Sequence, residues 1–164
     1  MKEIRANTSQ GRKEERTPAR HDDSYRFDAK MKGPVCCPRC GALYRKGRWT
    51  WEAAPPDAAK HNCPACQRIE DNFPAGYITL KGAFFAAHRA EILDLISARE
   101  ARARAEHPLQ RLIGVETLAD GVRVTTTDAH LARTLALAVH DSYRGDLDLD
   151  FGRDENLLRA TWSR

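Results

Sequence analysis

The sequence predicts an α+β protein made of two small parts, and three observations support this fold class. Two Cys-Pro-x-Cys pairs stand in the first half, with 22 residues between Cys40 and Cys63. A stretch with helical periodicity follows them. The last third alternates apolar and polar residues in the order strand, strand, helix, strand, strand. A small cysteine-rich unit is therefore expected, joined by a long helix to a ββαββ antiparallel-sheet domain.

The two cysteine pairs have the spacing of a four-thiolate zinc ribbon. The expected ligands of one Zn²⁺ ion are Cys37, Cys40, Cys63 and Cys66. In each pair a proline follows the first cysteine and presets φ there, so that a tight turn brings both sulfurs to one ion. Four thiolates around a tetrahedral ion leave no open position for a substrate, so the site is expected to be structural.

Other uses of the cysteines remain open at this stage. Paired Cys-x-x-Cys motifs also serve as redox dithiols or disulfides. Cys36 is the spare cysteine; it is an alternative ligand to Cys37, or a reactive thiol if the protein is a thiol redox sensor. His61 is a weaker candidate ligand and is better explained as a loop residue.

Composition sets bounds on the class of protein. A chain of 164 residues with five cysteines is too poor in cysteine for a secreted disulfide scaffold. The charged start Met1–Arg5 does not look like a signal peptide, and no run approaches the ~18 apolar residues of a membrane span. We therefore expect a soluble cytoplasmic protein in a compartment that keeps thiols reduced.

The charge is unevenly distributed along the chain. Residues 1–82 carry sixteen Lys and Arg against ten Asp and Glu, a balance of +6, whereas residues 109–164 carry seven against nine, a balance of −2. This asymmetry indicates an end that faces a polyanion and another end with a separate task. Residues 1–33 are polar and mixed in charge, and are expected to form a disordered basic tail.

Residues 34–82 are expected to form the zinc ribbon. Aromatic residues and Thr50 around Lys46-Gly47 predict a hairpin, with Trp49 and Trp51 on one of its faces. The consecutive prolines at 55 and 56 predict a loop, because proline cannot join a strand ladder. After the second cysteine pair, residues 76–80 predict another strand of this unit.

The ribbon hairpin combines cations with flat rings, the side chains that grip phosphates and stack on unpaired bases. The candidate RNA contacts are Arg45, Lys46, Arg48, Trp49, Trp51 and Arg68. The alternative is that the tryptophans fill the interior of a ribbon too small for an ordinary core. The sequence favours that alternative for at least one of them.

Residues 83–108 predict a connecting helix between Gly82 and Pro108, with an apolar stripe along its first half. Residues 109–164 predict the ββαββ domain. A hairpin turns at Asp120-Gly121, Asp128 caps a helix that stops at Gly145, and Asp146, Asp148 and Asp150 mark the solvent side of an amphipathic strand. No phosphate loop, calcium loop or nucleophile–base pair is evident, so no enzyme activity is expected.

The cysteine pairs, together with the segment from Thr126 to Arg133, carry a resemblance to a known family. Residues 34–164 resemble the N-terminal zinc-ribbon part and following domain of the ribosomal large-subunit export adaptor family of archaea and eukaryotes. They look still closer to a bacterial group of small zinc-ribbon proteins. The resemblance implies zinc at the four cysteines and contact with ribosomal RNA or ribosomal protein.

The sequence as a whole therefore predicts a non-enzymatic zinc-binding protein that binds RNA and is associated with ribosomes. The alternative is a zinc-ribbon adaptor that binds a protein partner through the hairpin or the open sheet face. A thiol redox sensor is the remaining possibility. Neither the RNA, the partner nor the oligomeric state follows from the sequence.

Overall fold

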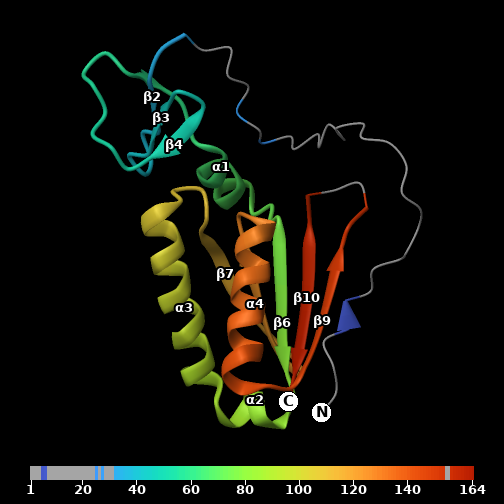
Figure 1. Cartoon of the computed structure of the whole chain (residues 1–164). Coiled ribbons are helices and arrows are strands. Elements are labelled where there is room, and N and C mark those ends of the chain that lie inside the picture. Colours follow the sequence, from blue (N-terminus) through green and yellow to red (C-terminus); the bar gives the residue numbers. More distant parts are fainter. Residues whose placement is uncertain (1–4, 7–24, 26, 28–31, 154–155) are drawn as a thin grey trace.

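The computed structural model describes residues 5–6, 25, 27, 32–153 and 156–164. Most of the tail predicted over residues 1–33 lies outside these described residues. Two bodies are visible in Figure 1: a small unit with its own strands, and a larger sheet covered by helices. We call residues 32–72 the ribbon unit and residues 76–164 the sheet unit. Among the described residues, no helix combines the length and the apolar character needed to cross a membrane.

The ribbon unit holds a four-stranded sheet and one short helix. The sheet has the order β4-β3-β2-β5, from β2 (Val35–Cys36), β3 (Leu43–Arg45), β4 (Arg48–Thr50) and β5 (Ala59–Lys60). The predicted hairpin is confirmed: β3 and β4 pair antiparallel, and the turn between them places Lys46 and Gly47 at φ 51° and 79°. Helix α1 (Pro64–Asp71) follows the second cysteine pair and leads toward the sheet unit.

Aromatic rings fill the interior of the ribbon unit. The Tyr44 and Trp49 ring centroids lie 5.3 Å apart, and Phe27 lies 4.6 Å from the first and 5.4 Å from the second. Val35 and three of the four paired cysteines are buried in the same cluster, and Cys40 packs against it half-buried. So few residues cannot supply an aliphatic core, which makes the rings and the cysteine site the main stabilising features of this unit.

The sheet unit contains the predicted ββαββ order. The four strands are β7 (Leu112–Leu118), β8 (Gly121–Thr126), β9 (Asp146–Phe151) and β10 (Leu158–Ser163), with α4 (Ala129–Tyr143) between β8 and β9. Two further strands, β1 (Arg5–Ala6) and β6 (Gly76–Lys81), complete a six-stranded sheet of order β1-β9-β10-β6-β8-β7. The sheet is mixed, because β6 runs parallel to β10 and β1 (Arg5–Ala6) runs parallel to β9, while the other pairs are antiparallel.

Strand β6 (Gly76–Lys81) corrects the predicted arrangement. The sequence predicts this strand as part of the ribbon, within residues 34–82, whereas it lies at the centre of the six-stranded sheet between β8 and β10. Its alternation buries Gly76, Ile78 and Leu80. Such a pattern predicts a strand with one covered face but does not say which sheet covers it.

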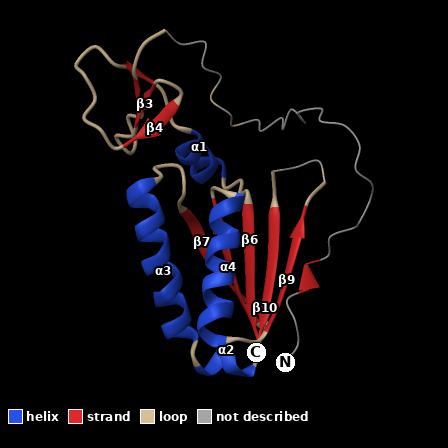
Figure 2. Cartoon of the chain, viewed as in Figure 1, coloured by secondary structure: helices blue, strands red, loops and turns tan. Residues whose placement is uncertain are grey.

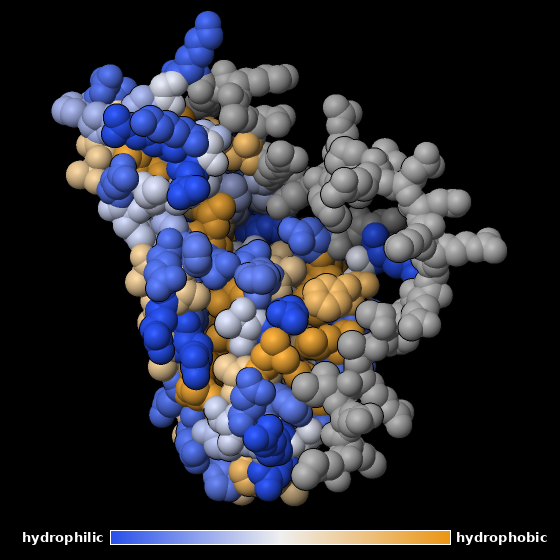
Figure 3. Space-filling model, viewed as in Figure 1, coloured by the Kyte–Doolittle hydropathy of each residue, from blue (hydrophilic) through white to orange (hydrophobic). Residues whose placement is uncertain are grey.

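Helices cover one face of the sheet (Figure 2). The predicted helix over residues 83–108 is two helices, α2 (Ala83–Ala87) and α3 (Arg89–Glu106), which meet at His88. The predicted apolar stripe consists of Phe85, Ile92, Leu95 and Ile96. The first, second and fourth of these are buried in the core with residues of the sheet and of α4, and Leu95 packs against that core partly buried. On the near side in Figure 3, hydrophilic side chains gather over the ribbon and α3, and hydrophobic ones show beside α4.

The helix and strand ends of the sheet unit match their sequence signals. The Asp128 carboxylate accepts a hydrogen bond from the Leu131 amide (3.1 Å), as expected of an N-cap residue. Gly145 follows the end of α4 with φ 95°, a value that favours glycine. The side chains of Asp146, Asp148 and Asp150 are exposed, so this acidic row is the solvent side of β9.

Candidate metal centre

The four paired cysteines meet at one point. The sulfurs of Cys37, Cys40, Cys63 and Cys66 all lie within 4.8 Å of one another, and those of Cys40 and Cys63 are 3.7 Å apart. Four sulfurs placed about 2.3 Å from a tetrahedral zinc ion would be separated by about 3.8 Å. The donor set and its dimensions therefore fit a metal ion held by four thiolates.

A tight turn presents the first pair of sulfurs. The Cys37 amide donates to the Ala42 carbonyl (2.8 Å), and the Gly41 amide donates to the Cys37 carbonyl (2.9 Å). Gly41 has φ 81°, a left-handed value that lets the chain curl back behind Cys40. This turn brings the Cys37 and Cys40 side chains to the same side.

The start of α1 presents the second pair. Cys63 is the N-cap residue, and its sulfur accepts from the Cys66 amide at 3.4 Å. Pro64 fills the first helical position, where no amide donor is needed. The Cys63 amide in turn donates to the Cys37 sulfur at 3.3 Å, which ties the two pairs together. Backbone donors and the positive end of the helix dipole both favour negative charge on these sulfurs.

The two doubtful ligands lie outside this cluster. The Cys36 sulfur points to the Cys37 and Gly41 carbonyls at 3.8 and 4.0 Å, and the side chain is buried in β2. The His61 ring lies 5.3 Å from the Phe27 ring and 3.4 Å from the side-chain amide of Gln67. The register with Cys37 as the clustered residue is the one that the structure adopts.

A residue that the sequence analysis missed lies against the sulfurs. Arg111, in the loop between α3 and β7, is 5% exposed, and its guanidinium nitrogens lie 3.4 Å from the Cys66 sulfur, 3.2 Å from that of Cys40 and 3.3 Å from that of Cys63. In the sequence it is one arginine among many, at least 45 positions from each of these cysteines. No local pattern marks it, because its role depends on how the two units meet.

The loop that carries Arg111 is fixed by the sheet unit. The Arg111 Nε donates to the Pro108 carbonyl (2.7 Å), and its amide donates to the Thr127 hydroxyl (3.0 Å). That hydroxyl donates to the Leu109 carbonyl at 2.6 Å, and Leu109 packs against the ribbon interior. Thr127 therefore supports the arginine from the segment that joins β8 to α4.

The sulfurs and Arg111 shift one another's protonation. The hydrogen bond shared with Cys63 lowers the pKa of Cys40 to about 4, and the charge of Arg111 acts in the same direction. The same hydrogen bond, together with burial, raises the pKa of Cys63. Burial lowers the pKa of Arg111, but its hydrogen bond to Cys66 and the charges of the sulfurs outweigh this and raise it overall. The site thus already favours one thiolate beside a permanent cation.

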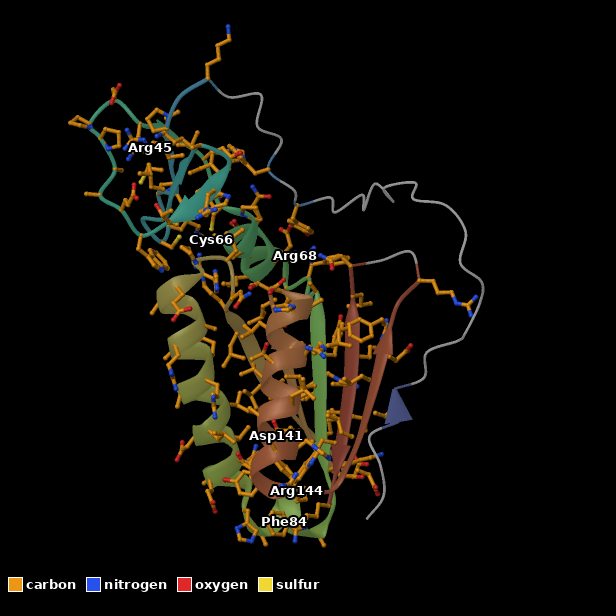
Figure 4. All side chains as sticks on the ribbon, in the orientation of Figure 1. Arg45, Cys66, Arg68, Phe84, Asp141 and Arg144 are labelled. Atoms are coloured by element: carbon orange, nitrogen blue, oxygen red, sulfur yellow. The ribbon has the colours of Figure 1, made fainter. Side chains whose placement is uncertain are left out.

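The candidate RNA contacts separate into two groups. Arg45, Lys46 and Arg48 are exposed around the hairpin turn, and together with Thr50 and Glu52 they line a hollow of about 460 Å³. Arg45 lies farther from the sheet unit than Cys66 does (Figure 4). We call Arg45, Lys46 and Arg48 the basic tip.

The remaining three candidates make contacts within the protein. Trp49 is 9% exposed among the ribbon rings. The Trp51 indole donates to the Arg104 carbonyl at the end of α3 (2.6 Å). Arg68 is 6% exposed, donates to the Phe73 carbonyl and lies 4.5 Å from the centroid of the Tyr25 ring, so its guanidinium is not presented to an external phosphate.

No family model, curated protein or solved structure matches the chain.

Proposed function

We propose that the protein holds one structural zinc ion at Cys37, Cys40, Cys63 and Cys66 and binds RNA through the basic tip, without enzymatic activity. The observation that supports the metal is the cluster of four sulfurs within 4.8 Å. Sulfur ligands alone favour zinc over hard cations such as Mg²⁺ or Ca²⁺. A tetrahedral ion with four protein ligands has no position for a substrate or an activated water, so the role of the metal is to stabilise the fold.

The first test is the metal content. The purified protein should contain one zinc per chain by elemental analysis, and Cys40→Ser or Cys66→Ser should lose the metal and the ribbon fold together, because a unit this small folds only around its ion. Cys36→Ser is the matched control, since its sulfur lies outside the cluster; it should keep the zinc. A folded ribbon without stoichiometric metal would contradict the zinc proposal.

Electrostatics and geometry support the RNA part of the proposal. The basic tip presents three cations on a hairpin around an open hollow. Among the described residues no ion pair holds any of the three, unlike Arg39, whose guanidinium lies 2.9 Å from the Glu70 carboxylate. Cations fixed on a hairpin track a phosphate backbone without reading its sequence. Association with ribosomes, which present RNA at high density, and a cytoplasmic location are parts of the same proposal.

A salt titration tests the tip. Replacing Arg45, Lys46 and Arg48 together by alanine should weaken binding of a mixed-sequence RNA and flatten the salt dependence by about two to three units, since each lost phosphate contact removes about 0.7 to 0.9. The matched control replaces Arg99, Arg102 and Arg104, three exposed cations on α3. The proposal fails if both triple variants bind RNA and sediment with ribosomes as the unaltered protein does.

One observation favours a second candidate, an adaptor that binds a protein. A hollow of about 400 Å³ lies where the β6–β8–β7 part of the sheet meets the end of the ribbon unit, lined by Asn72, Pro74, Tyr77, Gly114, Val115, Glu116, Arg123 and Thr125. Val115 is 50% exposed there. Phe73, which stands between the lining residues Asn72 and Pro74 in the sequence, is 57% exposed. If this candidate is right, Val115→Asp should abolish a nuclease-resistant pull-down while leaving RNA binding intact.

A further inference from the structure

We propose that Arg111 is a positioning residue for the metal site, through which metal loading fastens the ribbon unit onto the sheet unit. The inference rests on the proposed zinc site and adds to it a residue from the other unit. Its basis is the set of contacts between one guanidinium and the sulfurs of Cys40, Cys63 and Cys66, at 3.2 to 3.4 Å.

The charge of the loaded site gives the first reason. Four thiolates around a divalent ion carry a net charge of −2, and three of the four cysteines that would share this charge are buried. An isolated buried charge is strongly unfavourable unless a partner of opposite sign lies beside it. Arg111 is the cation that the described part of the chain places against the sulfurs, at 3.2 to 3.4 Å from three of them.

The shape of the guanidinium gives the second reason. Arginine offers five N–H donors in a rigid planar fork, whereas lysine offers a compact charge on a flexible stem. Here Nη1 faces one sulfur, Nη2 faces two, and Nε is held by the Pro108 carbonyl. The plane of the fork is therefore fixed from the sheet side, and the sulfurs are held in a defined arrangement from that side.

The junction gives the third reason. The described residues join the two units here through contacts that include Arg111 with the sulfurs, Leu109 with the ribbon interior, and the Trp51 indole with the Arg104 carbonyl. The Arg111 guanidinium also lies 5.9 Å from the centroid of the Trp51 ring. Of the three, the arginine contact is the one whose strength depends on the charge of the metal site, and hydrogen bonds to a charged group are the stronger ones.

Thermodynamic linkage gives the consequence. If docking of the loop 107–112 raises the affinity of the ribbon for its metal, metal loading must strengthen docking by the same factor. The protein would then hold its two units in one arrangement when loaded and release the ribbon from the sheet unit when metal is withdrawn.

The first experiment measures the metal site itself, with zinc affinity determined against a competing chelator and with cobalt(II) as a spectroscopic probe. Arg111→Ala should weaken zinc binding about 10- to 100-fold, the usual cost of losing a group that hydrogen-bonds metal ligands. Without its N–H donors, the sulfur-to-cobalt charge-transfer band should move to lower energy. Arg111→Lys keeps the charge and loses the planar fork of donors. Its zinc affinity and its cobalt band should lie between those of the unaltered protein and those of Arg111→Ala.

Arg68→Ala is the matched control. It removes an arginine of similar burial, 6% against 5% exposed, whose guanidinium lies against Phe73 and Tyr25. It should leave the cobalt band unshifted. If Arg111→Ala does not fold, the Lys variant decides the question by the same two readouts.

The second experiment measures the coupling by hydrogen exchange in residues 107–112, which contain none of the four cysteines. In the unaltered protein, chelation should speed exchange of these amides, and in the Arg111→Ala protein exchange should be fast with or without metal. The inference is overturned if Arg111→Ala leaves the zinc affinity and the cobalt spectrum unchanged, or if it weakens the affinity without shifting the cobalt band. It is also overturned if the exchange rate of residues 107–112 in the unaltered protein does not depend on metal. Failure of the unaltered protein to bind zinc or cobalt would instead refute the zinc proposal on which the inference rests.

Discussion

Two tryptophans that look equivalent in the sequence have different roles at the level of single residues. Both follow the hairpin turn at alternate positions, yet Trp49 lies among the rings of the ribbon interior, and Trp51 lies at the end of α3. Strand β4 ends at Thr50, so the alternation that would place them on one face stops before Trp51. The first is a filler of the ribbon and the second is part of the junction.

This difference predicts separate consequences for stability. Trp49→Ala should destabilise the zinc-loaded ribbon by about 3–5 kcal/mol, the usual cost of truncating a large core ring. Trp51→Ala should cost about 1 kcal/mol, the net value of one hydrogen bond. Urea denaturation of the loaded proteins measures both, and Trp51→Phe, which removes the indole N–H but keeps a ring, is the control. Equal losses for the two alanine variants would contradict this division.

At the level of elements, the packing of α4 on β6 depends on a glycine. A Cβ atom at Gly76 would lie 2.4 Å from both the Ala132 Cβ and the Thr126 Oγ1. Because Gly76 has no side chain, α4 can pack directly against the backbone at the start of β6. At the same place the Thr126 hydroxyl donates to the Asp128 carbonyl (2.7 Å), within the segment that leads from β8 into α4.

Gly76→Ala should consequently destabilise the sheet unit by about 1–3 kcal/mol, because an added methyl group in a packed interface forces backbone or side-chain shifts. Gly114→Ala in β7 is the matched control, since its nearest neighbour would be the Thr125 Oγ1 at 3.9 Å. Surface changes of this kind usually stay within about 0.5 kcal/mol. Chemical denaturation measures the stability of both variants. Similar stabilities would contradict the prediction and would show that α4 can shift away from β6 to make room for a methyl group.

At the level of the whole molecule, the boundary between the units falls before β6. This strand pairs with β8 and β10 over its whole length, from Gly76 to Lys81. Its protection from solvent should therefore depend on the sheet and not on the metal, even though the sequence groups it with the ribbon.

Chelation of the metal tests this boundary. Hydrogen exchange should become fast in β2 to β5 and in α1, whereas β6, β8 and β10 should stay protected, because sheet strands in a core open only with the whole unit. The change should occur between Asn72 and Gly76. If β6 loses protection together with the ribbon, the two units share one cooperative core, and the boundary drawn here is incorrect.

Features that depend on neighbours along the chain follow from the amino-acid sequence alone. The cysteine spacing identified the four clustered sulfurs, with Cys37 preferred over Cys36. The turn residues Lys46-Gly47 and Asp120-Gly121 marked both hairpins, and Asp128 marked the start of α4. Each of these signals is local. A backbone φ value, a helix cap and the spacing of two cysteines that reach one ion all depend on only a few neighbouring residues.

The segments that meet from distant parts of the chain become known from the packed molecule. Residues 76–80 predict a strand, but the partners of β6 in the sheet, β8 and β10, lie about 45 and 80 residues farther along the chain. Arg111 has no sequence signal at all, since the guanidinium reaches sulfurs 45 to 71 positions away only after the ribbon has docked on the sheet unit. Long-range pairing and the partners of a buried charge are properties of the packed molecule, because local sequence fixes the conformation of a segment and not its position in the fold.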